Sequence, residues 1–339
     1  MNASNWTVAV LLGICLASQF SRVSATPVTP PQACWTGDPT EPWNKPAGNT
    51  AHPDSAALVH TLWNKGSDRP GNINLLPSYS VFAVEAATST YAVTSDHGNL
   101  DGQTVPFAAG WRPHHPDGQI IVVDQSNSLT YEFFGAAVDD ADRKISAIRA
   151  DLLTPDADSP EGHGAHAPSR GIGLPYIHML IFECEVERGL ISHALSLRIA
   201  RPRCGEAWFP AAKVENHRDC SDAGIPEGAR FVVRIDPKSR DKWLRGLLAN
   251  GGGALRKMGA AIADALETYG FYVTDNGGET AGFDIQNFET FSPESPIKQL
   301  AARQPEIVTN MLDDLFVSQS ITAVAEQGPR LLRKKSAPP

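Results

Sequence analysis

Hydrophobic and polar residues alternate over short stretches along most of the chain, which predicts many short β-strands. The clearest pair, QIIVVD and LTYEFFG, lies within residues 118–135 and flanks a polar QSNS turn, so it predicts a β-hairpin. One face of this hairpin is apolar with an acid at its rim: Ile120, Val122, Asp124, Leu129, Tyr131 and Phe133. The other face is half polar: Gln119, Ile121, Val123, Thr130, Glu132 and Phe134.

Glu132 is the main catalytic candidate, because it stands in mid-strand beside Gln119 on the half-polar face. A carboxylate at such a position is unfavourable unless it contacts solvent, a partner or a ligand. Glu132 is therefore either a catalytic acid or base, or a member of a structural ion pair or an exposed sheet face. Asp124, at the rim of the apolar face, is the second candidate acid.

A further strand is predicted over residues 191–200, where one face is apolar except for a single imidazole: His193, Leu195, Leu197 and Ile199. His193 is either a hydrogen-bonded core histidine or a cleft residue whose pKa near neutrality suits proton transfer. The pattern favours the core histidine and leaves both open.

The stretch LIFECEVERG just before it is acidic. As a strand it would place Glu183, Glu185 and Glu187 on one face, as in a metal site. As a single helical turn it would be solvated and would end at Gly189. The helical turn is the simpler interpretation, because three carboxylates on one face repel each other without a cation.

Helices are predicted over residues 54–65, 241–249, 255–269 and 305–316, and the charged stretch at residues 139–151 has short helical character. Gly270 is predicted to cap the third of these helices. The stretch FYVTDNGGETAGFDIQ predicts a hairpin that turns at Asn276 and Gly277, and ITAVA predicts a closing strand. Many short strands with few helices predict a mainly β fold, a jelly-roll-like β-sandwich with one or two packed α-helices.

The pattern of apolar and Pro- and Gly-rich stretches divides the chain into a signal peptide, an arm, a main domain and a tail. An apolar run over residues 8–17, followed by Val23-Ser24-Ala25, predicts a secretory signal peptide over residues 1–25 that is cleaved after Ala25. A Pro- and Gly-rich arm is expected over residues 26–75, the sandwich over 76–327, and a disordered basic tail over 328–339. No later apolar run reaches the roughly 18 residues that a membrane span requires. We therefore expect an extracellular or periplasmic monomer without a transmembrane span.

The chain is acidic. Its 29 basic and 38 acidic residues give a net charge of −9, which becomes −10 when Arg22 leaves with the signal peptide. An acidic surface argues against binding to nucleic acid.

Four cysteines remain after Cys15 is removed, and an even number in an exported protein suggests two disulfides. Of the three possible pairings we favour Cys204 with Cys220, which closes a short loop, and Cys34 with Cys184, which would attach the N-terminal arm. The alternative is that some of them stay as buried thiols.

Several motifs of this sequence belong together: GLP at residues 173–175, Glu185, GLISHAL at 189–195, Pro210-Ala211, IPEGAR at 225–230, ALETYG at 265–270 and DNG at 275–277. They resemble a widespread family of secreted bacterial and fungal proteins with the pattern GLP, G.I.HAL, WPA, PMG.R, ALKKYG and ADNG. The resemblance extends from about residue 40 to 325 and implies no particular activity. A histidine of the family falls at or near Gln119, and its Arg-His after WPA is Ala212 and Lys213 here. Any catalytic role of those positions is therefore altered.

No cofactor is expected. The loop that follows residue 153 carries mixed oxygen and nitrogen ligands, Asp156, Asp158, Glu161, His163 and His166, but without a familiar metal-binding spacing. A divalent cation in this loop is a secondary option.

Two functions of different classes fit a secreted, acidic β-protein. The first, which we prefer, is an enzyme acting on an extracellular polysaccharide. As a lyase it would use His193, Tyr131 or Tyr176 as the base and Arg170 or Arg198 to neutralise the uronate; as a hydrolase it would use Glu132 with a second acid. Its substrate-binding candidates are Gln119, Tyr131, Arg170, Tyr176 and Arg198.

The second function is that of a non-catalytic glycan-binding or envelope-associated protein. The choice of a glycan rests on fold analogy.

Overall fold

The computed structural model describes residues 40–48, 50–64, 73–153, 170–214, 220–277, 281–317, 321–325 and 331–333. The predicted signal peptide, Cys34 and the possible cation loop at residues 156–166 lie outside the described residues.

Twelve strands form one mixed sheet, in the order β13-β10-β11-β8-β12-β1-β4-β5-β7-β2-β3 with β6 beside β7, and β9 pairs separately with β14. The strands are β1 (Ile73–Ala83), β2 (Thr90–Gly98), β3 (Thr104–Pro106), β4 (Ile120–Asp124), β5 (Leu129–Phe134), β6 (Ala137–Asp139), β7 (Lys144–Leu153), β8 (Leu195–Ile199), β9 (Glu206–Trp208), β10 (Arg230–Ile235), β11 (Phe271–Asn276), β12 (Ala281–Gln286), β13 (Ile321–Ala325) and β14 (Leu331–Arg333). The helices are η1 (Pro42–Asn44), α1 (Ser55–Asn64), α2 (Glu183–Arg188), α3 (Pro237–Thr268), η4 (Phe288–Thr290), α4 (Pro296–Arg303), α5 (Pro305–Thr309) and α6 (Asp313–Val317).

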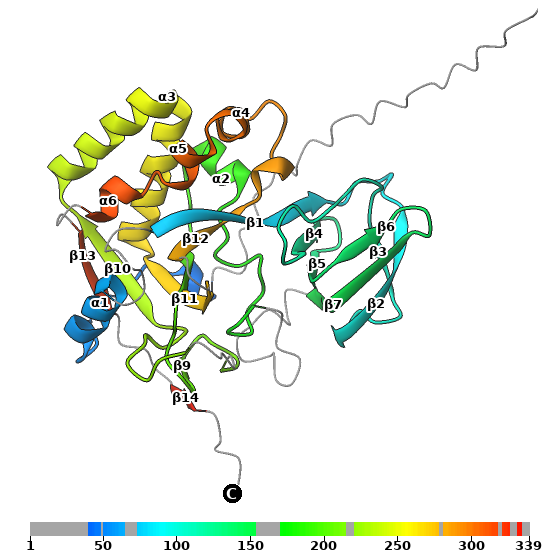
Figure 1. The fold of residues 1–339 in the computed structure, drawn as a ribbon, viewed down its shortest axis with the longest axis horizontal. Coiled ribbons are helices and arrows are strands. Elements are labelled where there is room, and N and C mark those ends of the chain that lie inside the picture. The colour runs from blue at the N-terminus through cyan, green and yellow to red at the C-terminus, as the bar shows by residue number, and fades with distance from the viewer. Residues whose placement is uncertain are drawn as a thin grey trace, which may run out of the picture.

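Strand β1 joins two lobes (Figure 1). Its first part pairs with β12 up to Tyr79, and its second part pairs with β4 from Ser80 onward. The helical lobe consists of the first part of β1, strands β8 and β10–β13, and the helices. The strand lobe consists of the second part of β1 and strands β2–β7. Because one strand belongs to both lobes, side chains at its centre lie where the two lobes meet.

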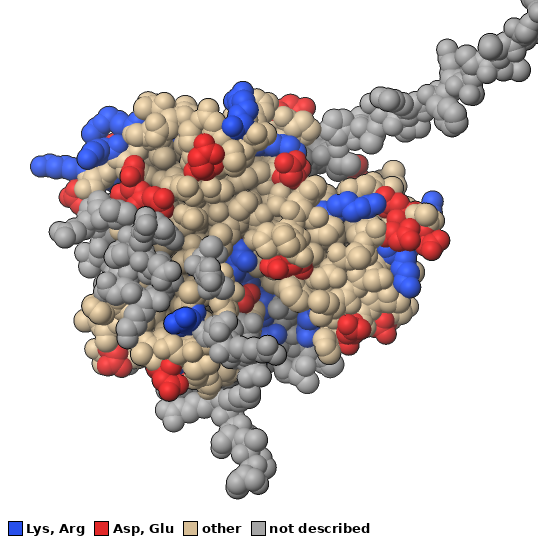
Figure 2. Space-filling view, viewed as in Figure 1, with Lys and Arg blue, Asp and Glu red and all other residues tan. Residues whose placement is uncertain are grey.

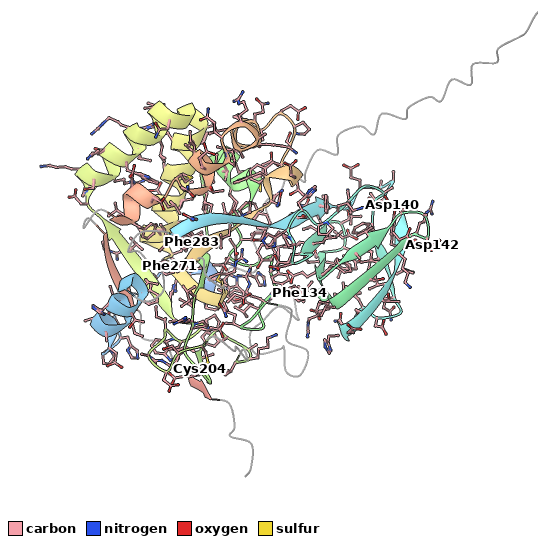
Figure 3. All side chains as sticks on the ribbon, in the orientation of Figure 1. Phe134, Asp140, Asp142, Cys204, Phe271 and Phe283 are labelled. Atoms are coloured by element: carbon pink, nitrogen blue, oxygen red, sulfur yellow. A yellow bond between two sulfur atoms is a disulfide. The ribbon has the colours of Figure 1, made fainter. Side chains whose placement is uncertain are left out.

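The core of the helical lobe lies between α3 and one face of the sheet. In β8 and β12 every second residue, such as Leu195, Leu197, Phe283 and Ile285, belongs to this core. Phe271 and Phe283 meet edge to face at 5.4 Å, and Figure 3 shows both in the helical lobe. The residues between them point to the opposite face, which is consequently free to be polar.

The strand lobe confirms the predicted hairpin. Strands β4 and β5 pair with Val122 opposite Tyr131, in the register that the turn requires. The apolar face packs in the core of the strand lobe, whereas Ile121, Val123 and Phe134 belong to a different cluster on the other face. Glu132 therefore lies on the face that the sequence predicted.

One prediction about topology is not confirmed, and another is wrong. The chain is mainly β, but a jelly-roll of two packed sheets is not found among the described residues, since the long strands share one mixed sheet. The predicted hairpin at Asn276 and Gly277 does not form, because β8 lies between β11 and β12. Alternation along the sequence defines strands and their faces, but contains no information on which strands are neighbours.

Four of the predicted helices exist with modified limits, but the short helical character expected over residues 139–151 is wrong, because most of that stretch forms β7 between β5 and β2. Residues 241–249 and 255–269 form one helix, α3, which is kinked at Gly252, where φ is 76°. Gly270 adopts the left-handed conformation that a helix cap requires, with φ 70°. Segment 305–316 is divided into α5 and α6. The predicted closing strand is β13, while Leu331–Arg333, predicted to be part of a disordered tail, forms β14 against β9.

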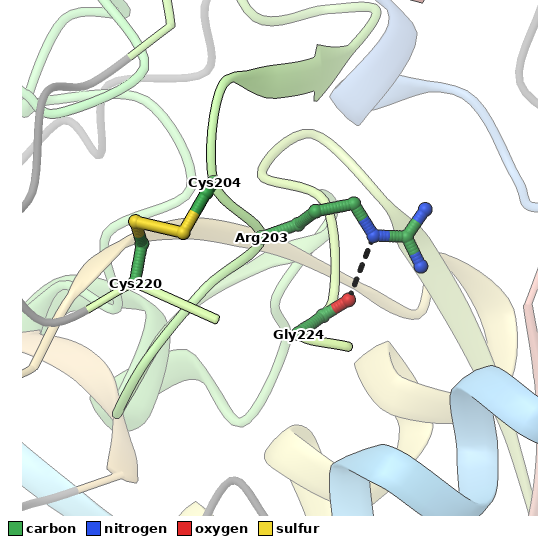
Figure 4. The surroundings of a disulfide bond; sticks show 4 residues. All are labelled: Arg203, Cys204, Cys220 and Gly224. Atoms are coloured by element: carbon green, nitrogen blue, oxygen red, sulfur yellow. Dashed lines mark hydrogen bonds between the residues drawn. A yellow bond between two sulfur atoms is a disulfide. The ribbon is translucent and has the colours of Figure 1, made fainter. Parts of the chain in front are cut away.

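The disulfide between Cys204 and Cys220 is present, with Cα atoms 5.0 Å apart (Figure 4). The neighbouring Arg203 Nε donates a hydrogen bond of 2.9 Å to the carbonyl oxygen of Gly224. Cys184 is also disulfide-bonded. Within the part of the chain that the structure describes, no helix is both long and apolar enough to cross a membrane.

Candidate functional site

The candidate site is the sheet face that points away from α3, which we call the polar face. Its side chains alternate with the core residues of β8, β11 and β12, and they are buried although they are polar: Ser196, Arg198, Thr274 and Asp284. Residues 170–182, which contain the GIGLPYIHML motif, bond to this face through Arg170 and through the Ile181 N–H to Asp284. Buried polar groups need partners, so each of their contacts is informative.

Asp284 is the centre of the polar face and lies between two arginines. Its Oδ1 is 2.7 Å from Nε of Arg198, and its Oδ2 is 3.2 Å from Nη1 of Arg170. Ser196 donates a hydrogen bond of 2.5 Å to the same Oδ2 and lies 2.6 Å from the hydroxyl of Thr274. Two guanidinium groups therefore face this one carboxylate, and the charges of Asp275 and Asp117 also act on Arg198.

Arg170 fastens its own segment, residues 170–182, to the sheet. Its Nη2 donates to the carbonyl oxygens of Tyr176 at 2.7 Å and His178 at 3.0 Å, and its Nη1 also donates to Ser196. The side chain is completely buried. Arg170 is thus a structural clamp and cannot contact a substrate in this conformation.

Glu132 holds the same segment from the side of the strand lobe. Its Oε2 accepts the backbone N–H of Tyr176 and its Oε1 accepts that of Ile177, both at 2.7 Å. Each carboxyl oxygen therefore serves a backbone donor, and the residue is 0% exposed. Burial raises the pKa of Glu132 to about 8, although both N–H groups and Arg170 act to lower it. The group is a buried acceptor for the chain.

Tyr79 and Tyr176 are located where the lobes meet. Their rings are 4.7 Å apart, and the guanidinium carbon of Arg170 lies 5.9 Å from each ring centre. Arg198 lies 6.0 Å from the ring of Tyr79. The hydroxyl of Tyr79 is buried without a hydrogen-bond partner among the described residues. Burial, and then Asp284, raise its pKa well above the usual value.

Gln119 is the neighbour of Tyr79. Ser80 of β1 pairs with Ile120 of β4 in a parallel register. Tyr79 and Gln119 each come one position earlier, so they lie side by side, and we place both on the polar face. Gln119 is 4% exposed, and its Oε1 also lacks a partner among the described residues. Two buried polar atoms without a hydrogen-bond partner among the described residues thus belong to neighbouring residues on adjacent strands.

Arg198 is the most exposed charged member of the group, at 8% against 0% for Arg170 and 1% for Asp284. Its Nη2 donates to the hydroxyl of Ser78 and its Nε faces Asp284, whereas Nη1 has no partner among the described residues. Its guanidinium is therefore held at two of its three nitrogens.

The surface above Arg198 carries an imidazole and an acid. His115 lies 3.3 Å from Asp117, with 33% and 47% of their side chains exposed. Burial lowers the pKa of His115, Asp117 opposes this change, and the charge of Arg198 adds to it, so the imidazole is close to the arginine. Figure 2 shows a recess between the two lobes in which basic and acidic atoms are visible together.

His193 belongs to another part of the molecule. It precedes β8, its Nε2 lies 3.0 Å from Oε1 of Glu185, and its Nδ1 lies 2.8 Å from the carbonyl oxygen of Ala194. His193 is 6% exposed. Among the described residues, His193 and Glu132 share no hydrogen-bond partner. His193 is therefore buried and held by Glu185 and Ala194, as the core interpretation expects, and the described contacts do not join it with Glu132 in one cleft.

Asp124 and Tyr131 lie on the opposite face of the strand lobe. Asp124 accepts hydrogen bonds from the backbone and side-chain nitrogens of Asn127, at 3.1 and 2.8 Å, and so stabilises the turn after β4. Tyr131 packs in the core of the strand lobe. Neither residue contacts the polar face.

The acidic stretch forms helix α2, closed by Gly189 in the left-handed conformation, as the simpler interpretation predicted. It is not solvated, since Glu183 and Glu185 are 4% and 5% exposed. Glu185 accepts the N–H of Phe182 at 3.0 Å, and Glu183 accepts that of Ser292 at 2.7 Å. Burial raises the pKa of Glu183 to about 7. Within the described ranges, no group of three or more His, Cys, Asp and Glu side chains is placed to hold a metal ion.

The structure thus brings together five of the predicted residues, Gln119, Glu132, Arg170, Tyr176 and Arg198. Three residues central to the group, Tyr79, Ser196 and Asp284, were not predicted. The signal for Asp284 was available in AGFDIQ, where a single acid alternates with Phe283 and Ile285. No family model, no curated protein and no solved structure matches this chain.

Proposed function

We propose that this protein is a secreted, non-catalytic binder of an extracellular polysaccharide that carries carboxylates, and that Arg198 receives the carboxylate. This choice reverses the preference drawn from the sequence, which favoured an enzyme. The observation that carries it is the state of Arg198, whose guanidinium is held by Asp284 and Ser78 while Nη1 has no hydrogen-bond partner among the described residues.

A fixed arginine suits carboxylate recognition. Its planar guanidinium presents parallel donors that match a carboxylate, and charge-assisted hydrogen bonds are the stronger kind. Because Asp284 and Ser78 already hold the side chain, little conformational entropy is lost on binding. His115 and Asp117 next to it offer donors and acceptors to sugar hydroxyls.

The unpaired atoms of Tyr79 and Gln119 support a ligand at this position. A buried polar atom without a partner is rare in native proteins and unfavourable. The two residues lie on adjacent strands, and the ring of Tyr79 is 6.0 Å from the guanidinium carbon of Arg198. A ligand or water that enters beside Arg198 gives the hydroxyl and the amide oxygen a partner.

Catalysis is less well supported, since the candidate groups are already engaged. Both oxygens of Glu132 accept backbone N–H groups, and a general acid must reach the leaving oxygen. A lyase would need a tyrosine with a lowered pKa beside the arginines, yet burial raises the pKa of Tyr79. His193 is paired with Glu185 elsewhere.

The test is calorimetric titration with polygalacturonate and with neutral dextran, accompanied by assays for reducing ends and for unsaturated product. We expect polygalacturonate to bind without cleavage and dextran not to bind. Loss of a charge-assisted pair is worth about 1.5–3 kcal/mol, so Arg198→Gln should weaken binding by about 10- to 100-fold. Arg198→Lys, which keeps the charge beside Asp284 but not the planar fork, should also weaken it.

Arg112→Gln is the matched control, because Arg112 is likewise paired with an aspartate, Asp140, but on the strand lobe at 2.6 Å. It should leave the affinity unchanged. Cleavage of polygalacturonate by the wild type, or equal affinity of wild type and Arg198→Gln, would overturn the proposal.

A further inference from the structure

Helix α3 carries a concentration of positive charge on an otherwise acidic protein. Its first part, PKSRDKWLRGLLANGGGALRK, covers residues 237–257 and contains six basic residues and one acid, a net charge of +5, whereas the whole chain has −9. Figure 2 shows basic atoms gathered over the outer side of α3, at the upper left of the view. Such a local reversal of charge is a property of the surface and not of the fold.

Three of these cations form one stripe. Lys238, Lys242 and Arg245 follow the spacing i, i+4 and i+7, which places them along one side of the helix over about 10 Å. All three are exposed, and none forms an ion pair among the described residues. None of the three is therefore held in a close ion pair within the described part of the chain, although the Ser239 hydrogen bonds, helped by the charge of Lys238, lower the pKa of Asp236.

Two of the other three cations of the segment make contacts that the stripe does not make. Arg240 pairs with Asp264 at 2.5 Å and with Glu267 at 3.2 Å, and Lys257 donates to the carbonyl oxygen of Glu187 at 2.7 Å. These contacts fasten α3 to itself and to α2. Fastening contacts thus account for some basic residues of α3 but leave the stripe unexplained.

We infer that Lys238, Lys242 and Arg245 form a second binding surface, which takes a further stretch of the same carboxylate-bearing polysaccharide. This inference rests on the proposed function. Arg198 lies on the sheet face opposite α3, so one chain segment cannot occupy both places without passing around the helical lobe. Two separate surfaces make the protein able to bridge polymer chains or to bind one long chain with increased avidity.

A polysaccharide fits this stripe better than a membrane does. An interfacial helix inserts an apolar face, but the apolar side of α3 is packed in the core, and Leu248 is its one exposed large hydrophobic residue, at 48%. A flexible anionic polymer needs only a row of accessible cations. The net negative charge of the whole chain disfavours polyanions on surfaces that lack such a row or an arginine such as Arg198.

The experiment compares long polygalacturonate with a short oligogalacturonate, using the full chain. The stripe variant is Lys238→Gln/Lys242→Gln/Arg245→Gln. The control, Lys45→Gln/Lys144→Gln/Arg303→Gln, removes the same charge from exposed positions outside α3. We expect the stripe variant to bind the long polymer at least about tenfold more weakly, with a smaller dependence on salt, while the control changes little.

The short ligand separates this inference from the proposed function. Oligogalacturonate affinity should depend on Arg198 and not on the stripe. If the stripe variant binds the long polymer as wild type does, the second surface is wrong while the function at Arg198 stands. If wild type binds neither ligand, both are wrong. Binding of duplex DNA or of anionic vesicles that the stripe variant loses, with no such loss for polygalacturonate, overturns the assignment of the partner.

Discussion

Replacement of Glu132 tests whether this buried acid holds the chain or performs chemistry. Its two oxygens accept the N–H groups of Tyr176 and Ile177 at 2.7 Å each. In Glu132→Leu both donors are left buried without a partner. An unsatisfied buried group costs about 1–3 kcal/mol, so we expect a loss of about 2–6 kcal/mol in the free energy of unfolding.

Glu132→Gln provides the intermediate case. The amide keeps one acceptor oxygen, while its NH2 group faces the other N–H donor and cannot accept from it. The expected loss is therefore about half as large, about 1–3 kcal/mol. Glu132→Gln should therefore lose about half as much stability as Glu132→Leu, because it leaves one backbone donor without a partner and not two.

The measurement is urea unfolding at neutral pH, followed by tryptophan fluorescence and circular dichroism. Glu85→Gln is the control, since Glu85 is exposed and should change the stability by less than about 0.5 kcal/mol. The reasoning would be refuted if Glu132→Gln were as stable as wild type but lost the ability to cleave a glycan. That outcome would restore Glu132 as a catalytic acid.

Three further predictions concern pH and cross-links. Burial raises the pKa of Glu132 from 4.5 to about 8, so the contribution of this group to the free energy of unfolding falls as pH rises through that window. The loss of stability caused by Glu132→Gln should therefore become smaller between about pH 5 and 8. A loss that stays constant over this range would contradict the prediction. Burial lowers the pKa of His193, but Glu185 outweighs this effect and raises it. His193→Gln should therefore lower the free energy of unfolding more at about pH 5.5 than at about pH 8.5. The reverse order in urea unfolding would disprove the ion pair. Replacement of Cys204 and Cys220 by alanine should cost about 3 kcal/mol in the same assay, and an unchanged midpoint would show that the cross-link adds no stability.

Local patterns were sufficient for the parts of the fold that depend on near neighbours in sequence. The hairpin of β4 and β5, with its two faces, follows from alternation and a polar turn. The end of α3 follows from a glycine that can adopt positive φ, Gly270. In both cases the residues that decide the structure are separated by only a few positions.

The polar face could be predicted only in part, because its contacts join distant segments. Arg170 and Asp284 are separated by 114 positions, and Ser196 and Asp284 by 88. Glu132 was recognised as an unusual mid-strand acid, but its donors lie 44 and 45 positions away. The sequence showed that Glu132 needs a partner, and only the fold shows that the partner is the backbone.

The strand order explains the remaining error. A jelly-roll-like sandwich and one mixed sheet require the same kind of strands, and they differ in which edges pair. Here β1 pairs in parallel with both β12 and β4, which creates one surface across the lobes. That surface is what places Tyr79 and Gln119 near Arg198.

A crystal structure of the protein with a short oligogalacturonate tests the central claim most directly. We predict a sugar carboxylate at about 2.8 Å from Nη1 of Arg198, the usual length of a charge-assisted hydrogen bond, with Glu132 still bonded to Tyr176 and Ile177. A ligand bound elsewhere, or one whose glycosidic oxygen lies against a released Glu132 carboxyl group, would contradict the claim.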